Sequence, residues 1–138
     1  MSYSFIPHTA DVKVDVREKS VKEVFVSAAM AMKEVMAGKI RTGEVNSHKI
    51  NVSGKDLESL LYNFLEEFLF LFDAEDFIMS RIVDIKLDKD IFKLSAEVIG
   101  DKASGYKISN GVKAITYNDM FFQKEPDGTV KCQFVLDV

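Results

Sequence analysis

The segment between residues 57 and 72 is the feature of this sequence that most restricts its fold. Its apolar residues recur at helical spacing, but they form a stripe too broad for a helix that packs only one face. We therefore expect a helix that lies centrally and is covered on more than one side. A membrane span is not expected, since the apolar part at 64–72 has about half of the roughly 20 residues required and contains Glu66 and Glu67. The apolar positions are Leu57, Leu60, Leu61, Phe64, Leu65, Phe68, Leu69, Phe70, Leu71 and Phe72.

Another helix is predicted over residues 21–37. Ser20 and Glu23 form a capping-box pattern at its start, in which each side chain accepts a hydrogen bond from the backbone of the other residue. A similar pattern, from Ser53 to Asp56, predicts the start of the central helix.

Strands make up most of the remaining predicted structure. Residues 12–17 alternate valine with charged side chains, which is the pattern of a half-buried strand. Turn sequences at residues 88–90 and 125–128 favour antiparallel pairing of the strands beside them. We therefore predict a single α+β domain over residues 1–138, with mainly antiparallel sheets packed with two helices. The other expected strands are 3–6, 44–52, 77–87, 91–99, 112–123 and 130–138.

The charge balance argues against one class of function. The 138 residues include 22 acidic and 18 basic side chains, a formal net charge of −4. Nucleic-acid binding depends on Lys and Arg that neutralise phosphates, so no strong autonomous nucleic-acid binding is expected. The start of the chain lacks the basic and apolar regions of a signal peptide, and Cys132 is the single cysteine. Both features predict a cytoplasmic protein without a membrane segment.

The sequence lacks the common catalytic motifs. It contains no G-x-S-x-G, P-loop or H-E-x-x-H pattern. Cys132 lies in an alternating strand and is expected to be a small buried side chain rather than a nucleophile. We therefore expect the chain to have no enzymatic activity of its own.

Two aspartates near the ends of the chain form the best candidate site. Asp11 follows a turn, and Asp137 is followed by Val138, which adds further main-chain oxygens. If the strands that carry them are neighbours, these oxygens can hold a hard cation such as Ca²⁺ or Mg²⁺. A plainer interpretation is that Asp11 accepts hydrogen bonds from loop amides and that Asp137 is solvated at a frayed end.

Four segments in order resemble the archease family. They are HTADV at residues 8–12, a helix ending in LFD at 60–73, VKAITY at 112–117 and VLDV at 135–138. The similarity extends over essentially the whole chain.

The resemblance implies a non-catalytic partner of the tRNA-splicing RNA ligase. That enzyme joins ends bearing a 2′,3′-cyclic phosphate or 3′-phosphate to 5′-hydroxyls. The partner is expected to promote guanylylation of the ligase's active-site histidine, allow multiple turnovers and broaden nucleotide use. By similarity, Asp11, Asp137 and Val138 hold a divalent cation, commonly Ca²⁺.

The sequence departs from the family at two places. Relatives often have a histidine directly after the VKAITY strand, where this chain has Asn118, and another in the preceding loop, where residues 100–111 contain none. That polar loop has three glycines and is also expected to be the most mobile segment.

Two other functions remain open. A general chaperone or modulator of DNA- or RNA-processing proteins would bind clients through exposed Phe and Met, so it would show a large exposed apolar patch. A metal-dependent phosphoester hydrolase would use Asp11, Asp137 and His8 and would turn over a phosphoester without a partner.

Overall fold

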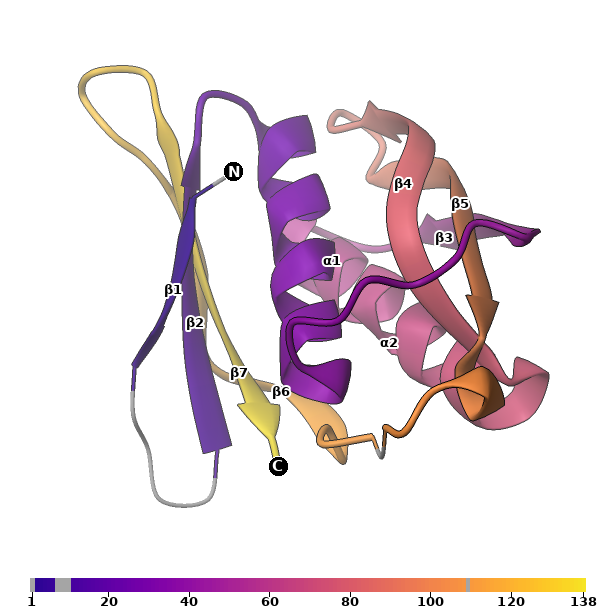
Figure 1. Cartoon of the computed structure of the whole chain (residues 1–138). Coiled ribbons are helices and arrows are strands. Elements are labelled where there is room, and N and C mark those ends of the chain that lie inside the picture. The colour runs from indigo at the N-terminus through magenta and orange to yellow at the C-terminus, as the bar shows by residue number, and fades with distance from the viewer. Residues whose placement is uncertain (1, 7–10, 109) are drawn as a thin grey trace.

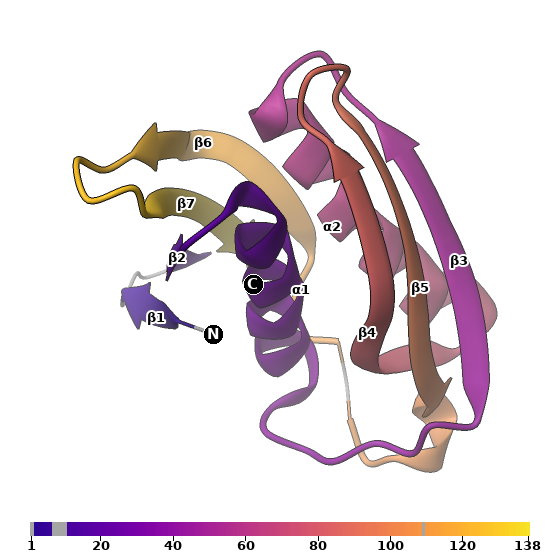
Figure 2. The same ribbon diagram turned by 90° about the horizontal axis from the view of Figure 1, so that it is seen from above.

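Two helices pack between two antiparallel sheets (Figures 1 and 2). The computed structural model describes residues 2–6, 11–108 and 110–138. The first sheet has the order β1-β2-β7-β6 and the second has the order β3-β5-β4. The elements in chain order are β1 (Tyr3–Ile6), β2 (Asp11–Glu18), α1 (Val21–Ala37), β3 (Asn46–Ser53), α2 (Leu57–Glu75), β4 (Phe77–Asp88), β5 (Lys93–Lys102), a short 3-10 helix (Ala103–Gly105), β6 (Ala114–Lys124) and β7 (Val130–Asp137). The predicted α+β class with two helices is confirmed.

Helix α2 has the central position that its broad apolar stripe predicts. It contacts all three strands of the second sheet, strand β6 of the first sheet and helix α1. Phe70 is an exception, because 54% of it is exposed. The buried positions of the helix are Leu60, Leu61, Phe64, Leu65, Phe68 and Leu71.

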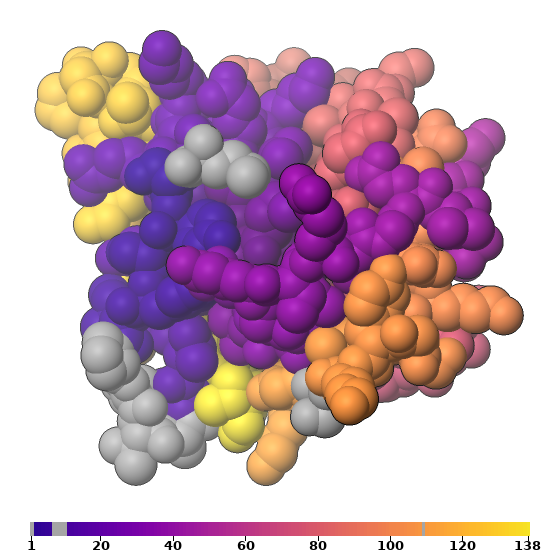
Figure 3. All heavy atoms as spheres, viewed as in Figure 1, coloured from indigo at the N-terminus to yellow at the C-terminus, as the bar shows by residue number. Residues whose placement is uncertain are grey.

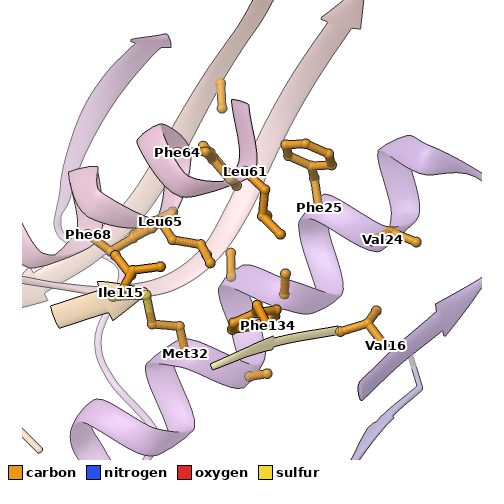
Figure 4. Close-up of a cluster of buried hydrophobic side chains, with 14 of the residues drawn as sticks. Val16, Val24, Phe25, Met32, Leu61, Phe64, Leu65, Phe68, Ile115 and Phe134 are labelled. Carbon is orange, nitrogen blue, oxygen red and sulfur yellow. The ribbon is translucent and has the colours of Figure 1, made fainter. Parts of the chain in front are cut away.

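The core fills the space between the sheets and the helices (Figure 4). Phe25 of α1 lies at its centre, with its ring centroid 5.9 Å from that of Phe64 and 5.9 Å from that of Phe122. Strands β2 and β7 contribute Val16 and Phe134, which are fully buried. Alternate positions of both strands, among them Val14, Val16, Cys132 and Phe134, therefore face the helices, and the positions between them face away, including the buried Val135.

The helix starts agree only in part with the capping patterns. Ser20 accepts a hydrogen bond from the backbone N–H of Glu23 at 3.2 Å, which is one half of the predicted capping box. The cap predicted for α2 is wrong, because Asp56 is the N-cap and forms its capping box with Ser59. Ser53 instead belongs to β3, where it pairs with Lys93 of β5. Ser53 and Asp56 are both residue types that cap helices. Because Ser53 pairs with Lys93 in the sheet, Asp56 is the residue that caps α2.

The predicted loop at residues 100–111 is partly wrong. Strand β5 continues to Lys102, and the Tyr106 hydroxyl then accepts a hydrogen bond from the Gly43 N–H and donates one to the Asp101 carboxylate. Asp76, which ends α2 in a left-handed conformation, accepts hydrogen bonds from the N–H and hydroxyl of Ser104. The first half of the segment is therefore attached to α2 and to the segment before β3.

Candidate metal centre

Asp11 and Asp137 lie opposite each other in the first sheet. Strands β2 and β7 are antiparallel neighbours, and their register pairs Asp11 with Asp137 at one end and Glu18 with Val130 at the other. Directly opposed residues point to the same face of a sheet, with Cβ atoms about 4.5–5.5 Å apart. From the sequence, the candidate site depended on the two strands being neighbours. In the structure they are neighbours.

The apolar pattern of the two strands sets this register. Val14 pairs with Phe134, and Val16 pairs with Cys132, and all four side chains are fully buried. A slip of one residue would turn these side chains away from the helices, so burial strongly favours the observed pairing. The same alternation places both aspartates on the outer face of the sheet.

The two carboxylates differ in their exposure. Asp137 is exposed, whereas Asp11 is half-buried and its Oδ1 atom is shielded from solvent. Asp137 is also held from its other side, since its carbonyl accepts a hydrogen bond of 2.7 Å from the N–H of Lys113. Val138 follows immediately and is 40% exposed, and the yellow end of the chain reaches the surface in Figure 3.

The oxygen atoms gathered here suit a hard cation. Like charges directly opposite each other destabilise a sheet, and a cation between them would remove that repulsion. Ca²⁺ takes six to eight oxygen ligands from carboxylates, main-chain carbonyls and water. Among the residues that the structure describes, no group of three or more His, Cys, Asp and Glu side chains is gathered, so the protein's donors here would be two carboxylates and the main-chain oxygens of Val138. His8 lies outside the described residues.

Lys13 places a positive charge beside the aspartate pair. It lies on the same face of β2, one pleat further along, and forms an ion pair of 3.4 Å with Asp119 of β6. The backbone carbonyl of Asp119 also accepts a hydrogen bond from the Gln133 side chain at 2.8 Å. These contacts tie β6 to both central strands next to the site.

Sequence analysis missed the irregularity of β6 that makes these contacts possible. The pairing with β7 jumps between Thr116 and Phe121, so residues 117–120 bulge out of the ladder. Asp119 has a φ of 58°, a conformation that Asp tolerates better than most residues. Nothing in the alternation of this segment marks the bulge; the Asn-Asp pair at its centre is the only local signal.

The bulge also determines the surroundings of Asn118. Asn118 is exposed, and its N–H donates to the Thr116 hydroxyl. Its neighbour Tyr117 stacks on Tyr62 of α2, with centroids 4.4 Å apart and rings 7° from parallel. Partial burial raises the pKa of both tyrosines above the ordinary value, and Glu66 adds to this effect.

Cys132 and His48, whose side chains could also carry chemistry, both pack against other parts of the protein. Cys132 is fully buried, and burial raises the pKa of its thiol, with Glu58 and Asp15 adding to the shift. The predicted buried position of Cys132 is therefore confirmed. His48 contacts the ring of Phe77 edge-on, with the ring centroids 4.5 Å apart.

In the described part of the chain, no helix has the length and apolar character needed to cross a membrane.

Comparison with known proteins gives a consistent result over the whole chain. Residues 3–138 match the family described as "Archease protein family (MTH1598/TM1083)". The chain is 38% identical to "Protein archease" of Pyrococcus abyssi over 135 residues, which cover 95% of this chain and 94% of the relative. It is 37% identical to "Protein archease-like" of Drosophila melanogaster over 123 residues, covering 87% and 79%.

A solved structure shares the fold. The solution structure of protein 1598 of Methanobacterium thermoautotrophicum superimposes with a TM-score of 0.82 at 32% identity, covering 99% of this chain and 98% of that protein. The arrangement of two helices between two sheets is therefore also that of an experimentally determined relative.

Proposed function

The chain belongs to the archease family, and from this premise we propose that it activates a tRNA-splicing RNA ligase. Family membership supports a role as a modulator or activator. The finer proposal is that the protein promotes guanylylation of the ligase's active-site histidine and allows repeated turnover. We also propose that it carries a divalent cation, Ca²⁺ or a similar hard ion, on Asp11, Asp137 and Val138.

The observation that carries this proposal is the pairing of Asp11 with Asp137. Two carboxylates on one face of a sheet form a negatively charged site, and strands β2 and β7, rather than a loop, fix its position. A cation bound there would be a positive charge that oxygen atoms of a phosphate or of a partner's carboxylate can approach. This chain's residues would hold and orient the ion where the partner's active site can meet it.

The structure gives less support to a general chaperone. Among the residues that the structure describes, the exposed large apolar side chains come from seven different strands, helices and connections, and α2 buries most of its apolar positions. The exposed residues are Phe5, Ile6, Val45, Phe70, Val83, Ile91, Tyr117 and Val138. A hydrolase remains distinguishable by one assay, in which the purified chain is incubated with a phosphoester and Ca²⁺, Mg²⁺ or Mn²⁺; turnover without the ligase would support it.

The proposal is tested by measuring RNA ligation by the cognate ligase with and without this protein. Wild-type protein is expected to convert single turnover into multiple turnover. Asp11→Asn and Asp137→Asn each remove one charge with little change in shape, and they are expected to lose the activation. Asp84→Asn is the matched control, since Asp84 is an exposed residue of β4 in the other sheet. Full activation by the Asp11 and Asp137 variants would contradict the proposed role of the pair.

A further inference from the structure

A cleft of about 550 Å³ opens at the end of the molecule opposite the aspartate pair. Its lining residues come from the β2–α1 connection, the start of α2, the end of β4 with the β4–β5 turn, and the β6–β7 hairpin. The two connections and the hairpin lie at the top of the view in Figure 1. Along β2, the seven residue-to-residue steps from Asp11 to Glu18 correspond to roughly 23 Å. The cleft is therefore separate from the candidate metal centre.

Four lysines line this cleft, and no Asp or Glu is among its lining residues. Two of them flank the start of α1, one lies in the β4–β5 turn and one ends β6, and all four are exposed. Within the described residues, none of them forms an ion pair. The lining of the cleft is therefore positively charged in a chain with a net charge of −4, and the acidic neighbours Glu23, Asp90 and Glu125 of these lysines are not part of that lining. The four residues, called the lysine rim below, are Lys19, Lys22, Lys89 and Lys124.

Two carboxylates in the surrounding turns, Asp88 and Asp127, bond to their own segments. Asp88 accepts hydrogen bonds from the backbone N–H groups of Asp90 and Ile91. Asp127 accepts hydrogen bonds from the N–H and hydroxyl of Thr129. These carboxylates stabilise the turns that carry the rim and do not line the cleft.

The floor of the cleft is apolar. Phe122 is held in place by its stacking on Phe25, with an angle of 25° between the rings. The first turn of α1 also lines the cleft, and its backbone dipoles add positive potential to that of the lysine rim. The other apolar lining residues are Val21, Leu57, Leu87 and Val130.

We propose that this cleft binds a nucleoside polyphosphate. The lysine rim would hold the phosphates, and the floor beside Phe122 would hold the base and ribose. The volume lies within the range of about 300–1,000 Å³ that is typical of small-ligand sites, and aromatic side chains commonly stack on bases. The ligand is a free nucleotide or the triphosphorylated end of an RNA, since both present the same chemistry.

The test is a titration of the full chain with ATP and with GTP at low salt in EDTA, followed by amide chemical shifts. EDTA removes divalent cations, so the result does not depend on the candidate metal centre at Asp11 and Asp137. Failure to bind nucleotide is therefore distinct from failure of the proposed function. We expect saturable binding with shifts at residues 19–22, 87–89 and 122–124. Lys22→Glu combined with Lys124→Glu is expected to weaken binding by about tenfold or more. The matched control is Lys49→Glu combined with Lys107→Glu, which changes the net charge equally away from the cleft.

Several results would overturn the proposal. The first is absence of nucleotide binding, and the second is equal nucleotide affinity of the two double variants. The third is binding of tripolyphosphate as tightly as ATP or GTP, because tripolyphosphate has no base to contact the apolar floor. Displacement of the nucleotide by a Glu-rich peptide of equal or higher affinity would instead assign the cleft to an acidic protein segment. A short 5′-triphosphorylated RNA separates the two sources: tighter binding than GTP indicates an RNA end, and weaker binding indicates the free nucleotide. Melting curves of the variants verify that they are folded.

Discussion

Asp11 and Asp137 are direct partners across the antiparallel ladder of β2 and β7, although 125 residues separate them in the sequence. The core residues of the same strands fix this relationship, because Val14 and Phe134 pair on the inner face while the aspartates share the outer one. A site built in this way has its geometry set by the sheet. Its chemistry can therefore be changed by substituting the carboxylates without disturbing the core.

Calcium is expected to stabilise the protein through this pair. At a concentration about 100 times the dissociation constant, a ligand that binds only the folded state adds about 2.7 kcal/mol, which corresponds to roughly 8 °C in Tm for a domain of this size. Thermal unfolding with and without Ca²⁺ measures the effect. Asp137→Asn is expected to lose most of it, and Asp84→Asn is expected to retain it. Equal calcium-dependent shifts in both variants would count against the assignment.

The N-cap of α2 provides a test of the helix start. Asp56→Ala is expected to cost about 1 kcal/mol of unfolding free energy, because the N–H of Ser59 loses its acceptor. Ser53→Ala is expected to change stability by less than about 0.5 kcal/mol, since Ser53 is an exposed residue of β3 and not the cap. Chemical denaturation of the two variants measures both values. A larger loss of unfolding free energy for Ser53→Ala than for Asp56→Ala would instead support Ser53 as the start of the capping box, as the sequence predicted.

The contact between Asp76 and Ser104 is expected to depend on pH. Hydrogen bonds from the Ser104 hydroxyl and N–H hold the pKa of the Asp76 carboxyl below its ordinary value of 3.8. A carboxyl with a lowered folded-state pKa contributes stability above its unfolded pKa and loses it as pH falls through the folded value. The difference in Tm between wild type and Ser104→Ala is therefore expected to be constant near neutral pH and to shrink below about pH 4. A difference that does not change between pH 7 and pH 2 would show that this pair does not titrate as described.

The core between the helices is expected to tolerate truncation poorly. Phe64→Ala removes a fully buried ring that contacts Phe25 and Phe68, and such changes typically cost about 3–5 kcal/mol. Phe70→Ala on the same helix is the control, because Phe70 is largely exposed, and it is expected to cost much less. Denaturant unfolding of both variants measures the contrast. Similar losses for the two would mean that α2 is not covered as the structure shows.

The parts of this fold that depend on local pattern could be predicted, and those that depend on distant pairing could not. Alternating valines in residues 12–17 indicated a strand with one buried face, but no local pattern names the partner strand. The bulge at residues 117–120 was missed because the Asn-Asp pair at its centre is its only local signal, and the residues on either side continue a strand pattern. The lysine rim was also missed, since its members are scattered over more than 100 residues and come together only through the two sheets.

The most direct test of the central claim is a calcium titration of the full chain followed by amide chemical shifts. The account predicts saturable, one-to-one changes concentrated at residues 11–13 and 135–138, which disappear in both Asp11→Asn and Asp137→Asn. Absence of calcium-dependent shifts at these residues, or shifts that persist unchanged in both variants, would contradict it.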